Sequence, residues 1–79
     1  MLSFLMLCET ARGGRFYRVE VADNLYGEYT VLREWGRRGC RGACRLAWFS
    51  NLRDACLAAE RGLRRAERRG FRAEGGRSA

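Results

Sequence analysis

The most informative stretch of the chain is Arg33-Glu34-Trp35-Gly36-Arg37-Arg38-Gly39, which closes an alternating run and opens a segment rich in arginine and glycine. It sets an aromatic face, a flexible backbone and a planar cation side by side. Guanidinium groups hold phosphate through forked hydrogen bonds, and aromatic faces stack on sugars and bases. Three residues prove little alone, so the interpretation depends on the sequence around them.

The residues on either side of this stretch predict a sheet. Residues 28–35 alternate, with Tyr29, Val31, Arg33 and Trp35 on one face. Upstream, the apolar residues 2–10 and the alternating residues 15–22 predict a hairpin joined by a glycine turn. Downstream, residues 45–49 predict a short strand in which Leu46 and Trp48 face one way and Arg45, Ala47 and Phe49 the other.

The next segment predicts a helix over residues 51–69. Asn51 followed by Asp54 is typical of a helix N-cap, and Gly70 can end the helix. An apolar stripe at helical spacing can cover one face of the sheet. Its members are Leu52, Ala55, Cys56, Ala59, Leu63 and Ala66. We therefore predict one α+β domain over residues 1–72, a four-stranded antiparallel β-sheet with one C-terminal α-helix packed on it, followed by a disordered tail at 73–79.

The charge of the chain is strongly positive and uneven. It has 79 residues and a net charge of +7, and all 16 basic residues are arginine. Residues 1–32 carry three arginines against four acids, whereas residues 33–79 carry thirteen against five. This asymmetry favours a nucleic acid or another anionic partner. The alternatives are a solvated basic face and a codon bias toward arginine.

The order of these segments resembles the WGR domain, which occurs in DNA-damage-sensing poly(ADP-ribose) polymerases and in short free-standing bacterial proteins. The resemblance covers roughly residues 2–71. The matching segments are Phe16–Val21, Leu25–Gly27, Glu28–Arg37, the glycine loop at Gly39 and Gly42, Arg45–Phe49, and Asn51–Arg69 closed by Gly70 and Phe71.

The resemblance implies roles for three residues of this chain. It implies that Trp35 packs on the sugar at the terminus of a broken strand, that Arg37 contacts DNA or a neighbouring domain, and that Arg45 lies against the DNA backbone. From the charge of the loop alone we add Arg38 and Arg41, and glycine allows close approach of a ligand backbone. The predicted nucleic-acid-binding residues are therefore Trp35, Gly36, Arg37, Arg38, Arg41 and Arg45.

Each aromatic residue also has a structural interpretation. Trp35 can be ordinary core, as aromatic residues at strand ends usually pack inward. Trp48 and Phe49 are assigned to the core, and Tyr17 and Tyr26 to structural roles. We expect the helix arginines to be solvated, and the glycines of the motif to be conformational.

Other functional classes have little support. The chain has no histidine for general-base work and no phosphate-loop signature, so we expect no enzymatic activity. Cys8, Cys40, Cys44 and Cys56 lack a convincing zinc or disulfide pattern, and are expected to be free thiols in a cytoplasmic protein without metal or cofactor. We expect no membrane partner and no small-molecule substrate.

The sequence leaves the macromolecular partner open. DNA ends, nicks or other irregular structures are the leading ligands, and RNA is an alternative because stacking and phosphate contacts do not distinguish the sugars. A protein-interaction adaptor or a homodimer is the other alternative. It is motivated by the first strand, which is apolar on both faces over residues 4–7.

Overall fold

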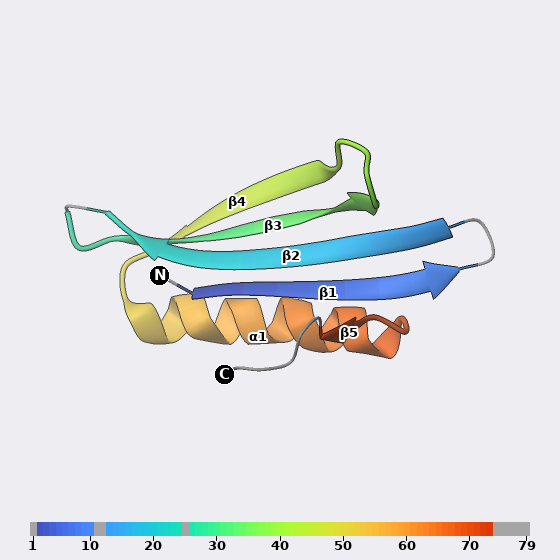
Figure 1. The fold of residues 1–79 in the computed structure, drawn as a ribbon. Coiled ribbons are helices and arrows are strands. Elements are labelled where there is room, and N and C mark those ends of the chain that lie inside the picture. The colour runs from blue at the N-terminus through green and yellow to red at the C-terminus, as the bar shows by residue number, and fades with distance from the viewer. Residues whose placement is uncertain (1, 11–12, 25, 74–79) are drawn as a thin grey trace.

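A computed structural model describes residues 2–10, 13–24 and 26–73 of the chain. In this part of the chain the fold is an antiparallel sheet with a helix lying along a single face of it (Figure 1). In chain order the elements are β1 (Leu2–Thr10), β2 (Gly13–Asp23), β3 (Tyr29–Arg37), β4 (Ala43–Phe49), α1 (Leu52–Arg68) and β5 (Arg72–Ala73). The predicted α+β class is confirmed.

The sheet has the strand order β4-β3-β2-β1-β5, and every neighbouring pair is antiparallel. The sequence did not predict β5, which pairs Met6 with Ala73 and Leu7 with Arg72. Gly70, at a φ of 96°, lets the chain reverse after α1 and reach the free edge of β1. Ala73 is thus part of the sheet, contrary to the predicted tail, and residues 74–79 lie outside the described residues.

The core lies between α1 and the sheet. Val19, Val21 and Val31 are essentially fully buried, and Val21 lies directly opposite Val31 on the same face. Ala55 and Ala59 of α1 pack on this cluster, because small side chains let the helix approach the sheet closely. Val19 and Val21 alternate with Arg18 and Glu20, so the apolar face of β2 is the face that α1 covers.

The helix begins where the capping signal predicts. Asn51 has extended backbone angles, and its side-chain oxygen accepts a hydrogen bond of 2.8 Å from the backbone N–H of Asp54. At the other end, the N–H groups of Arg69 and Gly70 donate to carbonyl groups of the last turn. These bonds satisfy backbone groups that helix ends otherwise leave without partners.

Replacing the capping residue tests this start of the helix. We expect Asn51→Ala to lower the free energy of unfolding by about 1 kcal/mol, because the first turn loses its side-chain acceptor. Urea unfolding followed by circular dichroism measures the change. Ser50→Ala is the matched control and should change stability by less than about 0.5 kcal/mol. Equal effects of the two changes would contradict the capping role.

The sheet face away from α1 carries exposed apolar side chains. Trp48 is 59% exposed and Leu46 is 49% exposed, so the assignment of Trp48 to the core was wrong. The physical reason is that one helix covers only one face, and Trp48 alternates with Phe49, which packs against the core. Tyr26, 85% exposed, has no packing role either. Cys56 is half-buried on α1.

Candidate functional site

The end of β3 places its side chains on the helix-covered face. Arg33 lies opposite the buried Val19, so Trp35 and Arg37, which follow at intervals of two, share this face. Trp35 lies opposite Tyr17 in β2. Trp35 is half-buried, so it is neither a fully exposed platform nor part of the central core.

A pocket of about 350 Å³ opens at this position, between the sheet and the C-terminal half of α1. Its aromatic walls are Phe16, Tyr17, Trp35 and Phe71. The Tyr17 and Phe71 rings meet edge to face, with their centroids 6.1 Å apart. The helix contributes Gly62 and Ala66, whose small size leaves the space open. A Cβ atom on Gly62 would lie 2.6 Å from the Tyr17 hydroxyl oxygen, so a larger residue there would displace that ring.

Four arginines line the same pocket: Arg15 from β2, Arg33 from β3, Arg65 from α1, and Arg69, the residue that caps the C-terminus of α1. Within the described ranges none of them forms an ion pair, and no acid lines the pocket. Unpaired guanidinium groups beside aromatic faces provide the contacts that phosphate and sugar groups require.

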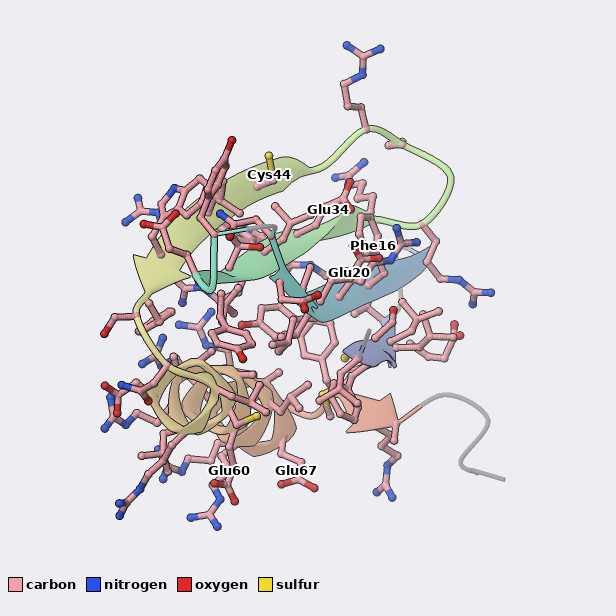
Figure 2. All side chains as sticks on the ribbon, turned by 90° about the vertical axis from the view of Figure 1, so that its left-hand side faces the viewer. Phe16, Glu20, Glu34, Cys44, Glu60 and Glu67 are labelled. Carbon is pink, nitrogen blue, oxygen red and sulfur yellow. The ribbon has the colours of Figure 1, made fainter. Side chains whose placement is uncertain are left out.

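The ion pairs that the structure does contain lie elsewhere. Arg18 pairs with Glu34 at 3.5 Å on the open face of the sheet, and Arg64 pairs with Glu60 at 2.9 Å along the helix. Figure 2 shows Glu34 on the sheet side away from α1, and Glu60 on the side of α1 away from the sheet. The acids that pair with arginine are thus outside the pocket, and no described acid compensates its positive charge.

The predicted site residues separate into two groups. Trp35 and Gly36 line the pocket, Arg37 lies exposed opposite Arg15, and Arg45 lies exposed opposite Arg33. These residues therefore gather around one end of the helix-covered face.

The remaining two, Arg38 and Arg41, lie in the segment between β3 and β4. Arg41 is exposed in the segment between β3 and β4. Arg38 donates a hydrogen bond of 2.8 Å to the carboxylate of Glu9, and its aliphatic part packs against Gly14. Arg38 is thus already engaged with a protein carboxylate and is not brought to the pocket.

Sequence reasoning missed Arg15, Arg33, Arg65 and Arg69. Arg33 could have been found, because it alternates with Trp35 on the same strand. Arg65 and Arg69 are spaced one helical turn apart and flank the small residue Ala66, a signal that the interpretation as solvated arginines overlooked. The position of Arg15 beside the pocket follows from the register of β2 against β3, which the sequence alone does not give.

Two glycines hold the end of β3 against the loop that follows. A Cβ atom on Gly36 would lie 2.9 Å from the Cα atom of Gly42. A Cβ atom on Gly42 would lie 2.8 Å from the carbonyl carbon of Trp35 and press directly on its oxygen. The backbone beside Trp35 is therefore packed at a distance that only glycine permits.

All four cysteines are free thiols, and Cys8 lines the pocket. Over residues 2–10, 13–24 and 26–73, no three metal-ligating side chains come together. In the same ranges no helix has the length and apolar character needed to cross a membrane.

Together these features define a small α+β binding module with a basic, aromatic pocket. The chain belongs to the WGR domain family, whose sequence profile matches residues 3–77. WGR domains are binding modules rather than catalytic domains, and the family is compatible with nucleic-acid binding in general.

A comparison with curated proteins gives a related sequence. The uncharacterized protein y4dW of Sinorhizobium fredii (strain NBRC 101917 / NGR234) is 34% identical over 58 residues. The match covers 73% of this chain, and the chain spans only 28% of the length of that protein. No solved structure matches the chain significantly.

Proposed function

We propose that this chain is a non-enzymatic nucleic-acid-binding module that takes DNA ends, nicks or other irregular structures into the pocket at Trp35. The supporting observation is the position of Trp35 in a pocket lined by four arginines that pair with no acid among the described residues. The ring of Trp35 stacks on a terminal sugar or base, and the guanidinium groups bind the adjoining phosphates. Arg37, Arg41 and Arg45 extend the contact along the backbone.

The shape of the pocket supports a preference for strand ends. In a continuous duplex the bases are paired and stacked and the sugars follow the backbone, so a nucleotide must leave the stack to enter a pocket. A terminal or unpaired nucleotide is already free to do so. The pocket lies between a sheet and a helix, so we expect a free terminus to reach Trp35 more readily than an unbroken duplex does.

Removing the Trp35 ring tests this preference. We expect Trp35→Ala to weaken binding to a nicked duplex about tenfold, because base or sugar stacking on an aromatic ring contributes ~1–3 kcal/mol. Binding to a dumbbell duplex without ends should change little. Fluorescence anisotropy with labelled substrates measures both affinities, and circular dichroism checks folding. Trp48→Ala, on the opposite face, is the matched control and should leave the preference intact.

The salt dependence of wild-type binding provides a second check on the same substrates. Four phosphate contacts predict a slope of about −3 to −4 in log affinity against log salt, since each contributes about −0.9. If the folded wild type fails to bind any of the substrates at low salt, the proposal is wrong. If the Trp35→Ala variant still prefers the nicked duplex, Trp35 is not part of the binding site.

A protein-interaction adaptor is the second candidate function, and the exposed apolar face favours it. Leu46 and Trp48 lie on the helix-free face, where Arg18 is neutralised by Glu34. A protein surface fits such a patch better than a nucleic acid does. Light scattering distinguishes the candidates: a dimer whose formation ignores salt, without nucleic-acid binding, would favour the adaptor. RNA remains an alternative nucleic acid for the pocket.

A further inference from the structure

We propose that the pocket at Trp35 also binds free nucleoside diphosphates, whereas the sequence led us to expect no small-molecule ligand. The inference shares its site with the proposed function but does not require nucleic-acid binding. Three features of the pocket support it: its volume, the four arginines that line it, and the aromatic side chains that form its walls.

The size and the walls of the pocket suit a detached molecule. The backbone N–H of Phe71 donates to the carbonyl oxygen of Ala66 at 3.1 Å, which turns the chain back so that the Phe71 ring meets Tyr17. The pocket is therefore bounded by the sheet, by α1 and by the residue that follows α1. A polymer needs only an open groove, whereas small ligands are held in pockets of roughly 300–1,000 Å³. The volume here, about 350 Å³, fits one small ligand.

The charge in the pocket exceeds what one nucleotide of a strand requires. A phosphodiester carries one negative charge. No acid among the described residues lines the pocket beside the four guanidinium groups of Arg15, Arg33, Arg65 and Arg69. A nucleoside diphosphate carries roughly three negative charges at neutral pH, one from the inner phosphate and up to two from the terminal one. Its pyrophosphate matches this cluster more closely than a single phosphodiester does.

The aromatic walls suit the nucleoside part. Trp35 and Tyr17 lie side by side on β3 and β2, and Phe71 lies edge-on to Tyr17. Aromatic faces stack on every base, since each base has a π-face. We therefore expect purine and pyrimidine diphosphates to bind within about tenfold of one another.

Fluorescence titration of a Trp48→Phe variant tests the proposal. This substitution leaves Trp35 as the reporter, since the chain has two tryptophans. We expect ADP to change the emission saturably, AMP to bind about tenfold more weakly and adenosine about a hundredfold more weakly. Each lost charge-assisted contact removes a factor of about ten or more. Calorimetry with ADP on the wild type confirms that the emission reports binding.

Substitutions of single arginines locate the site. Arg65→Gln and Arg69→Gln should each weaken ADP binding about tenfold. Arg53→Gln is the matched control, because it removes the same charge from the first turn of α1, outside the pocket, and should leave ADP binding unchanged. An equal loss from Arg53→Gln would overturn the pocket assignment, since it would reflect net charge alone.

The nucleic-acid titration separates this inference from the proposed function. If ADP up to about 10 mM gives no saturable change while the nicked duplex binds, the nucleotide inference is overturned and the proposed function stands. If ADP binds and no nucleic acid does, the proposed function fails and the nucleotide inference stands. Binding of inorganic pyrophosphate as tight as that of ADP would overturn the role of the aromatic walls.

Discussion

Gly42→Ala is expected to destabilise the protein by about 3 kcal/mol, because the new Cβ atom has no space beside β3. It would press on the carbonyl oxygen of Trp35, lie 2.8 Å from the carbonyl carbon and meet the Phe16 ring at 3.0 Å. The first two atoms belong to the backbone of a paired strand, so relief requires moving the end of β3. Urea unfolding followed by circular dichroism measures the loss.

Gly39→Ala is the matched control for this prediction. Gly39 has a φ of 81°, and a Cβ atom there would meet no atom within 4 Å. The change therefore carries only the backbone strain of a left-handed residue, about 1 kcal/mol. A loss at Gly42 no larger than that at Gly39 would show that the loop can move away from Trp35.

The outline of the fold could be read from local patterns. Alternation in residues 15–22 and 28–35 marked β2 and β3, and the pair Asn51 and Asp54 marked the start of α1. These signals depend on residues that are close in the sequence, so they can be recognised without knowledge of the tertiary structure. β5 could not be predicted, because a strand of two residues is too short to show a periodic pattern. It forms because the chain turns back after α1 and pairs with β1.

The candidate site was harder to predict because its residues come from separate elements. Trp35 belongs to a recognisable sequence motif, but the arginines beside it do not. The position of Arg15 beside Trp35 depends on the register of β2 against β3, and the positions of Arg65 and Arg69 depend on which side of the helix faces the sheet. The exposure of Trp48 depended on which face α1 covers. Each of these is a tertiary relation, so a sequence without aligned relatives does not determine it.

The two faces of the sheet suggest a division of contacts. On the open face Arg18 is engaged with Glu34, and in the β3–β4 segment Arg38 is engaged with Glu9, so neither guanidinium group is free. On the helix-covered face, Arg33 and Arg65 have no acidic partner among the described residues. Phosphate should therefore be drawn to the helix-covered face even though the whole chain is basic.

The double substitution Arg33→Gln with Arg65→Gln is expected to weaken binding to a nicked duplex about a hundredfold at low salt. Each lost charge-assisted hydrogen bond removes about 1.5–3 kcal/mol, and 1.4 kcal/mol is a factor of ten. The slope of log affinity against log salt should become shallower by about 2, because two phosphate contacts are lost. Anisotropy titrations at several salt concentrations give both quantities, and thermal unfolding checks that the variant is folded.

Arg18→Gln with Arg53→Gln is the control for this double substitution, because it removes the same two charges from places outside the pocket. We expect it to weaken binding less than about threefold, because charges far from the bound phosphates attract them only weakly through the salt solution. A hundredfold loss from both pairs would mean that net charge alone attracts the nucleic acid. A hundredfold loss confined to Arg33 and Arg65 would require the ligand to sit beside Trp35, because those two arginines come from different elements and meet only at the pocket.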